Sequence, residues 1–284
     1  MLDQVRRSAL GERPGTDHVI GSTYSVRQGI VPLRTRYGAR AELDTEILFG
    51  ESVEVLSRKN GYLRVRALVD GKEGYIPAHA LAVRRFRPTH RVWVPHVVAS
   101  KTRPVQSVAT LDLPMNALVR VLETPDKFSR LSVGGWVNHA CLKPLHEYER
   151  DFVEVALRFR GRPYKWGGRS ALGLDCSALL QLSLQACGYR NVPRDSGPQS
   201  QLLGEPVCDR EFRRGDLLFW KGHVAIVLNR YYLLHAADHT MTVVIEPIDA
   251  VLARRRREEP LDKQEITCVR RFPDYAERLI KRGP

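Results

Sequence analysis

The sequence has few of the features that mark membrane, exported or metal-binding proteins. In its 284 residues, no segment approaches the roughly 18 consecutive apolar residues that a membrane-spanning helix needs. The N-terminal stretch MLDQVRRSALGERPG contains no apolar run of about seven residues, so it does not resemble a secretion signal. We therefore expect a cytoplasmic protein without a membrane partner.

Cysteine is scarce, and the spacing of the cysteines shows no recognisable pairs. The five cysteines show no Cys-x-x-Cys pair and no metal-ligand spacing: Cys141, Cys176, Cys187, Cys208 and Cys268. An odd number without pairing favours free thiols in a reducing compartment. The sequence gives no reason to expect a bound metal or another cofactor.

The basic charge does not by itself identify a partner. The formal net charge is +13 at pH 7, but Lys and Arg are scattered along the chain. The one dense run, Arg254 to Arg257, is followed at once by Glu258 and Glu259, which is typical of a solvated surface. Without a zinc-finger or RNA-recognition motif, we expect no nucleic-acid partner, whereas a small substrate rich in carboxylates fits the charge equally well.

The first 145 residues have short apolar runs broken by Gly, Pro and Asp, which indicates β modules. A weak repeat relates residues 53–81 to residues 119–142, and each copy ends in a Gly-aromatic-aliphatic step and a leucine. We predict two modules, over residues 16–83 and 84–145. They resemble bacterial SH3-like domains, which are small all-β barrels; tandem β modules of other ancestry remain an alternative.

The pattern changes after about residue 146. Residues 152–159 keep helical spacing, and a second helix opens near residue 176. Four apolar runs with strand character follow, at residues 215–220, 223–228, 231–236 and 242–247. Helices followed by a run of antiparallel strands predict an α+β domain over residues 146–275.

The second helix opens with Asp175, Cys176 and Ser177. A cysteine in the first helical turn sits where free N–H groups and the helix dipole favour negative charge, so we expect the pKa of Cys176 to be lowered. Such a thiol is a candidate nucleophile. An isolated cysteine here is more often a core residue, as we expect for Cys187 on the same helical face.

Two histidines strengthen the case. His223 begins one predicted strand and His235 nearly ends the next, symmetrically about Asn229. A three-residue turn there would place the rings directly opposite each other on one sheet face, whereas a two-residue turn would separate them. One imidazole would then take the thiol proton while the other orients it. Packing or solvent-exposed histidines are the ordinary alternative, and a metal site lacks a third ligand with suitable spacing.

Four stretches occur in a characteristic order: YKWGGRSALGLDCSALL, VPRDSGPQSQLLG, RRGDLLFWKGHVAIVLN and LLHAA. Together they resemble the NlpC-type cell-wall peptidases, papain-like cysteine hydrolases that cut the γ-D-glutamyl to diamino acid bond of peptidoglycan peptides. The resemblance covers residues 148 to about 250. It implies that Cys176 is the nucleophile, His223 the general base and His235 the orienting residue.

The same resemblance implies a set of substrate-binding residues. Tyr164 would lie beside the thiol, Trp166 of the same motif is a further candidate, and Ser196 would line the groove. Asp175 and Ser177 would hold the substrate amine or backbone. The ordinary alternatives are core packing for the two aromatic residues and helix capping for the aspartate.

The chain departs from the family pattern at Ala178 and Ala225, where glycine is usual. Each adds one methyl group, which we interpret as repacking, although a narrower cleft would alter substrate choice. With SH3-like modules in front, the chain resembles family members that act on murein tripeptides or tetrapeptides with a free N-terminal L-Ala. In that arrangement Glu51 and Tyr75 of the first module are candidates to reach the substrate amine and the cleft.

This interpretation predicts a peptidase of cell-wall peptide recycling or remodelling that needs no metal. Two other functions remain open, namely an SH3-type wall-binding protein with an inert papain-like domain, and an amidase or acyltransferase on the same fold. The sequence does not choose between diaminopimelate and lysine at the diamino position. It does not fix the oligomeric state either, and a monomer is compatible with it.

Overall fold

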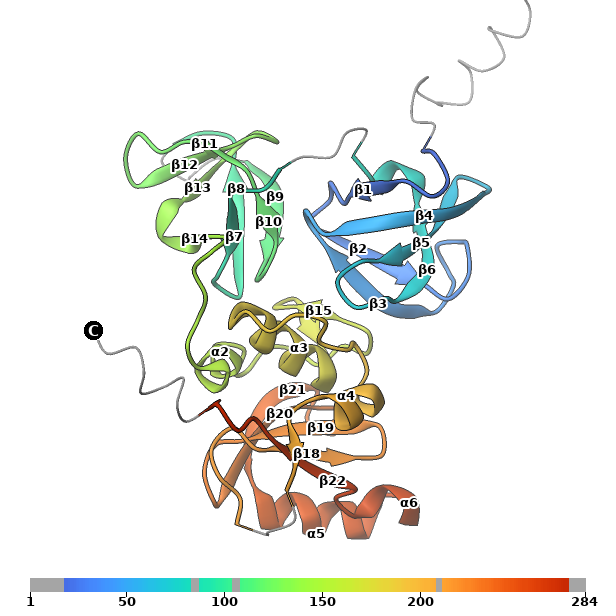
Figure 1. Ribbon diagram of the computed structural model, residues 1–284, viewed down its shortest axis with the longest axis vertical. Helices are drawn as coiled ribbons and strands as arrows, with labels where there is room; N and C mark the ends of the chain where they lie inside the picture. Colours follow the sequence, from blue (N-terminus) through green and yellow to red (C-terminus); the bar gives the residue numbers. More distant parts are fainter. Residues whose placement is uncertain (1–17, 83–86, 104–107, 208–210, 276–284) are drawn as a thin grey trace, which may run out of the picture.

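The computed structural model describes residues 18–82, 87–103, 108–207 and 211–275. The N-terminal segment and Cys208, which entered the sequence argument, lie outside these residues. The described chain forms two small β units at one end of the molecule and a mixed unit at the other (Figure 1). The predicted fold class, all-β modules followed by an α+β domain, is confirmed.

The first β unit is one six-stranded antiparallel sheet that curls around a core of its own. Its strands lie in the order β1-β4-β5-β6-β2-β3. Their bounds are β1 Thr23–Ser25, β2 Ile30–Arg34, β3 Leu43–Leu48, β4 Ser52–Lys59, β5 Tyr62–Ala67 and β6 Glu73–Pro77, before the short helix η1 Ala78–Ala80. Alternate residues, such as Val53 and Val55 on β4, point into the core, as period-two patterning requires.

The second β unit has two sheets, β10-β7-β14 and β11-β12-β13-β8-β9. Its elements are β7 His90–Val92, β8 His96–Ser100, β9 Ala109–Pro114, β10 Leu118–Val119, β11 Val121–Glu123, β12 Phe128–Leu131, β13 Trp136–Asn138, η2 His139–Cys141 and β14 Leu142–Pro144. Phe49 of the first unit packs into this core. A side chain at Gly50 would meet the Leu118 carbonyl oxygen at 2.2 Å, so the two barrels are in close contact.

The C-terminal unit is an antiparallel sheet between two layers of helices. The sheet order is β17-β22-β18-β19-β20-β21, and β15 pairs with β16 apart from it. Their bounds are β15 Arg169–Ser170, β16 Gly173–Leu174, β17 Glu205–Pro206, β18 Leu217–Trp220, β19 His223–Val227, β20 Tyr232–Ala237, β21 Thr242–Pro247 and β22 Cys268–Arg271. The helices are α2 Phe152–Leu157, α3 Cys176–Ala186, α4 Ser196–Leu202, α5 Ile248–Glu258 and α6 Leu261–Gln264.

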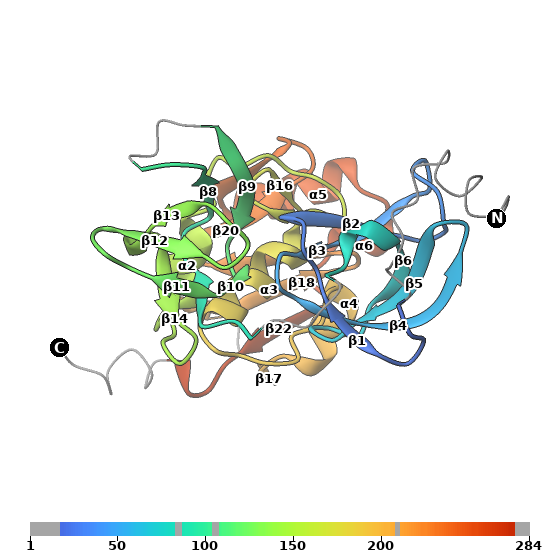
Figure 2. The same cartoon turned by 90° about the horizontal axis from the view of Figure 1, so that it is seen from above.

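Successive residues of the central strand β18 point to opposite faces of the sheet and pack against different helix layers. On β18, Leu217 and Phe219 pack with α2 and α3, whereas Leu218 and Trp220 pack with α5. Seen from above the barrels, α3 lies beneath the line along which they meet (Figure 2). Among the described residues, no helix is long and apolar enough to cross a membrane, and no disulfide joins the described cysteines.

A buried arginine joins the first barrel to the C-terminal unit. Arg169 is only 1% exposed, and its guanidinium donates to both carboxylate oxygens of Glu51 at 2.9 and 3.0 Å. It also donates to the Glu46 carbonyl at 2.8 Å and to Gln181 of α3 at 2.9 Å. Every guanidinium nitrogen is therefore hydrogen bonded, which a buried charge requires.

Loss of the Arg169 charge should destabilise the protein strongly. Arg169→Met leaves the Glu51 carboxylate buried without its partner, so we expect the free energy of unfolding in urea to fall by about 3–5 kcal/mol. The exposed pair Arg64–Glu73 gives a control, since Arg64→Met should cost about 1 kcal/mol or less. The double variant Arg169→Met/Glu51→Gln should regain part of the loss, and equal costs for the two single variants would contradict this assignment.

Candidate active site

Cys176 is the first residue of α3, and Asp175 alone separates it from the strand β16. Asp175 caps the helix, because its carboxylate accepts a hydrogen bond from the Ala178 N–H at 2.9 Å. The backbone N–H of Val224, the residue after His223, also reaches the Cys176 sulfur. The thiol therefore lies at the helix mouth and against the start of β19.

The predicted lowering of the Cys176 pKa is wrong. Burial, and then the negative charge of Asp175, raise the pKa of this thiol to about 12, although the Val224 and Ser177 N–H groups act in the opposite sense. The side chain is only 7% exposed, so loss of hydration outweighs the favourable helix end. The thiol therefore rests in its protonated form.

The two histidines are in contact, but not in the predicted register. Ile226 pairs with Leu234, so the three-residue turn is centred on Arg230 rather than on Asn229. His223 consequently lies diagonal to His235 and not directly opposite. The offset is two residues, which keeps both rings on one sheet face. His223 Nε2 lies 2.8 Å from His235 Nδ1.

The hydrogen-bonded row continues beyond His235 to residues that were not predicted from the sequence. Glu246 on β21 lies 2.7 Å from His235 Nε2, and its other oxygen accepts from Arg254 of α5 at 2.6 Å. Burial opposes its ionisation, yet the His235 and Arg254 hydrogen bonds lower the pKa of Glu246 to about 2. Leu233 pairs with Glu246, so the carboxylate is diagonal to His235, and only the β20–β21 register could have revealed it.

This row of groups fixes the protons on the imidazoles. Because the Glu246 carboxylate accepts, His235 Nε2 carries a proton and Nδ1 is left as an acceptor. His223 then donates through Nε2 and keeps a lone pair on Nδ1. Burial, followed by the charges of His235 and Arg255, holds the pKa of His223 well below 6.5, so this ring is neutral at rest. The protonated Cys176 thiol thus lies at the start of β19, where the neutral His223 imidazole keeps a free lone pair.

The two aromatic candidates of the YKWGG motif, Tyr164 and Trp166, differ from each other in burial. Tyr164 is half-buried against the core around α3, and burial and the nearby Cys176 raise the pKa of its hydroxyl. Its phenol therefore stays protonated close to the thiol. Trp166 is 67% exposed, which excludes core packing, the ordinary alternative for this residue.

Asp175 and Ser177 are part of a buried network around Arg194. The Arg194 guanidinium donates to both Asp175 oxygens, at 2.9 and 2.6 Å, and to the Ser177 hydroxyl at 2.9 Å. Its Nε donates to Thr45 of the first barrel at 2.7 Å. Both oxygens of the Asp175 carboxylate are thereby hydrogen bonded. This favours a role in capping α3 and in joining it, through Arg194, to the first barrel over the predicted contact with substrate. Ser196 is buried at the start of α4.

The prediction that Glu51 reaches the substrate amine disagrees with its position. Both of its oxygens are held by Arg169, and one also accepts the Leu48 N–H at 2.8 Å. Tyr75 lies half-buried on β6 with its ring edge-on to Tyr37, and its role in the cleft stays a prediction.

Glu46 is the carboxylate that sequence analysis overlooked. It is buried, accepts the Arg169 N–H at 2.8 Å, and pairs with the ammonium of Lys165 at 2.5 Å. Lys165 belongs to the YKWGG motif and its side chain is half-exposed. Among the described residues, no group of three His, Cys, Asp or Glu side chains is arranged to hold a metal ion.

Comparison with known proteins identifies two of the domains. The NlpC/P60 family matches residues 161–258, and the bacterial dipeptidyl-peptidase SH3 domain matches residues 33–81. Dipeptidyl-peptidase 6 of Lysinibacillus sphaericus is 26% identical over 253 residues, covering 81% of this chain and 90% of that protein. Gamma-D-glutamyl-L-lysine dipeptidyl-peptidase of Bacillus subtilis is 24% identical over 286 residues, covering 91% and 92%.

A solved structure shares the fold over most of the chain. The NlpC/P60 family protein from Bacillus cereus superposes with a TM-score of 0.73 at 20% identity, covering 88% of this chain and 99% of that one. The likeness extends over the barrels as well as the C-terminal unit. The C-terminal domain of this chain belongs to the NlpC/P60 family, and the protein is a cysteine peptidase that carries a bacterial SH3 domain in front of its catalytic domain.

Proposed function

We propose that Cys176 is the nucleophile, His223 the general base and His235 the orienting residue of a γ-D-glutamyl peptidase. The observation that carries the proposal is the hydrogen-bonded row from His223 through His235 to Glu246, beside the start of α3. It is the arrangement of nucleophile, base and orienting group that acyl transfer needs.

The proposed reaction has two steps. The Cys176 sulfur attacks the carbonyl carbon while its proton passes to His223 Nδ1, and the backbone N–H groups at the helix start hold the oxyanion. His223 then gives this proton to the departing amine, leaving a thioester on Cys176. In the second step His223 takes a proton from water, the hydroxide attacks the thioester, and the acid and the free thiol are released.

Glu246 supports this cycle through His235. When His223 becomes protonated, the positive charge lies at one end of a row that ends in an ionised carboxylate. The same carboxylate keeps His235 in the tautomer that accepts from His223. Without it, His235 can turn its protonated nitrogen toward His223, which then lacks a lone pair on the side of the thiol.

We propose that the substrate is a murein tripeptide or tetrapeptide with a free N-terminal L-Ala, cut between γ-D-glutamate and the diamino acid. The names of the two long relatives support this reaction class, and one of them names L-lysine at the diamino position. We assign the protein to cytoplasmic recycling or remodelling of cell-wall peptides, with diaminopimelate or lysine as the diamino acid.

Glu46 is better suited than Glu51 to receive the substrate amine. Its carboxylate is buried at the junction of the first barrel and the YKWGG loop, and one of its oxygens already binds an ammonium, that of Lys165. Lys165 has a long, flexible side chain that is half-exposed, so its ammonium can move into solvent when a substrate ammonium takes its place on Glu46. The Glu46 carboxylate is then never buried without a partner.

The substrate proposal is tested by mass spectrometry of reaction products. L-Ala-γ-D-Glu-meso-diaminopimelate and its L-lysine counterpart are incubated with the protein beside intact sacculi, with Cys176→Ala as the control. We expect L-Ala-D-Glu from the free peptides, little product from sacculi and none from the variant. Persistent failure on both peptides, together with hydrolysis of another amide, would favour the amidase alternative, and inertness toward all amides the binding protein.

Replacement of Glu246 should slow catalysis without preventing folding. Glu246→Gln removes a charged hydrogen bond worth about 1.5–3 kcal/mol, which corresponds to roughly a ten- to hundredfold loss of kcat. Glu265→Gln, whose carboxylate pairs with Arg256 on the surface, is the matched control and should leave kcat unchanged. Equal kcat for Glu246→Gln and wild type would remove Glu246 from the mechanism.

The pH dependence of the wild-type protein gives a further prediction. The value of kcat/KM should stay constant as the pH falls to 6.5, because the pKa of His223 lies well below that value.

The role of Glu46 is tested by the substrate's own amine. Glu46→Gln keeps a hydrogen-bond acceptor for the Arg169 N–H but loses the charge, so KM for the free-amine tripeptide should rise roughly tenfold. The N-acetylated tripeptide lacks the ammonium and should be cut equally poorly by both proteins. A KM that rises equally for both peptides would show a structural effect instead.

A further inference from the structure

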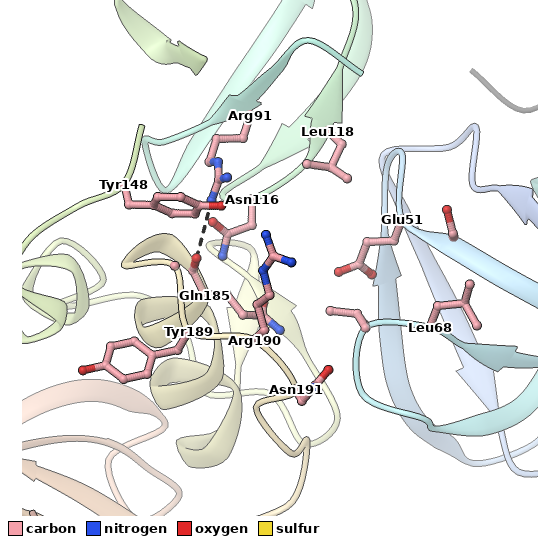
Figure 3. Close-up of a pocket in the computed structure, with 13 residues that line it drawn as sticks. Glu51, Leu68, Arg91, Asn116, Leu118, Tyr148, Gln185, Tyr189, Arg190 and Asn191 are labelled. Atoms are coloured by element: carbon pink, nitrogen blue, oxygen red, sulfur yellow. Dashed lines mark hydrogen bonds between the residues drawn. The ribbon is translucent and has the colours of Figure 1, made fainter. Parts of the chain in front are cut away.

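A cavity lies where the two barrels meet the catalytic domain. Its volume is about 380 Å³, and it is at the C-terminal end of α3, the end opposite Cys176. Glu51 and Leu68 of the first barrel form one wall, while Arg91 and Asn116 project from the second barrel (Figure 3). Small-molecule sites commonly have about this volume and favour domain boundaries.

Two arginines converge on one side of this cavity. Arg91 lies with its guanidinium 4.3 Å from the centre of the Tyr148 ring, and Arg190 enters from the loop after α3 (Figure 3). Hydrogen bonds from Arg91 and then Arg190 lower the pKa of the Tyr148 hydroxyl. Within the described part of the chain neither arginine forms an ion pair, and the Glu51 carboxylate across the cavity is held by Arg169. The cavity therefore has an excess of positive charge.

The amides beside the arginines add a second requirement. The Asn116 side-chain nitrogen donates to the Leu182 carbonyl at 2.9 Å, which leaves its oxygen as an acceptor. That oxygen, the Gln185 amide nitrogen and the Arg91 Nε are shielded from solvent and have no hydrogen-bond partner among the described residues. An occupant that satisfies all three must offer acceptor oxygens and also an N–H or O–H donor. A peptide amide next to a carboxylate has both, whereas a fully deprotonated inorganic anion has only the first.

We propose that this cavity binds a short acidic peptide, with its carboxylate between Arg91 and Arg190 and its amide toward Asn116 and Gln185. The site is about 15 Å from the thiol, given the length of α3 and the rise of a helix per residue. A ligand here contacts the second barrel and the catalytic domain at once, so its binding stabilises their packing. The inference does not depend on which peptide bond the enzyme cuts.

The test is calorimetric titration of the full chain carrying Cys176→Ala with the blocked dipeptide N-acetyl-L-Ala-L-Glu. This probe has amides and carboxylates but no free amine and no γ-glutamyl peptide bond, so it lacks the features proposed for the substrate. We expect a single site, with binding at least roughly tenfold weaker when Arg190→Leu is added, because a charged hydrogen bond is lost. The uncharged diamide of the probe should bind weakly to the same protein.

Arg230→Leu is the matched control. Arg230 is also an exposed arginine beside a tyrosine, with its guanidinium 4.5 Å from the centre of the Tyr231 ring, but it lies at the β19–β20 turn. Affinity for the probe should be unchanged in this variant. The proposal is overturned if the probe gives no binding, if the diamide binds as well, or if Arg190→Leu binds like the Arg230 control.

Discussion

The position of the candidate nucleophile depends on two buried guanidinium groups. Arg169 binds Glu51 and Gln181, and Arg194 binds Asp175, Ser177 and Thr45. Both arginines therefore tie the first turns of α3 to the first barrel. Buried ion pairs are costly to desolvate, and losing one partner costs more than the pair gains. The barrel is thus part of the frame that holds Cys176.

This frame explains the electrostatics around the thiol. Burial of Cys176 at the helix start and the Asp175 carboxylate beside it raise the pKa of the thiol, whereas the charge of Arg194, which binds Asp175, acts in the opposite sense. The same burial keeps His223 neutral. Because the thiol and the imidazole are both neutral at rest, the thiol proton has to move to His223 during attack. His223 can accept it only in the right tautomer, and His235 and Glu246 set that tautomer.

Much of this was predictable from local patterns. The helix start at Cys176, the capping by Asp175 and the strand alternation follow from short-range rules, which do not need the tertiary fold. The histidine contact was also predicted, although the turn is centred one residue later than expected. That error shifts the cross-strand partner by two positions, and an even shift leaves both rings on the same face.

Other features required the tertiary structure. The choice between Glu46 and Glu51 depends on where Arg169 and Lys165 arrive from a domain more than a hundred residues away. Glu246 belongs to a strand whose register with β20 no local signal fixes. The helix-end argument for a lowered thiol pKa failed because it omitted burial, which in this site is the larger effect.

The most direct test of the central claim is the rate of Cys176 alkylation by iodoacetamide at neutral pH, read by peptide mass mapping in the wild-type protein and in His223→Ala. If His223 accepts the thiol proton, the variant should react at least roughly tenfold more slowly, because a thiol of pKa about 12 ionises little without a base. Equal rates in the two proteins would show that Cys176 and His223 do not act together, and the assignment of the catalytic residues would fail.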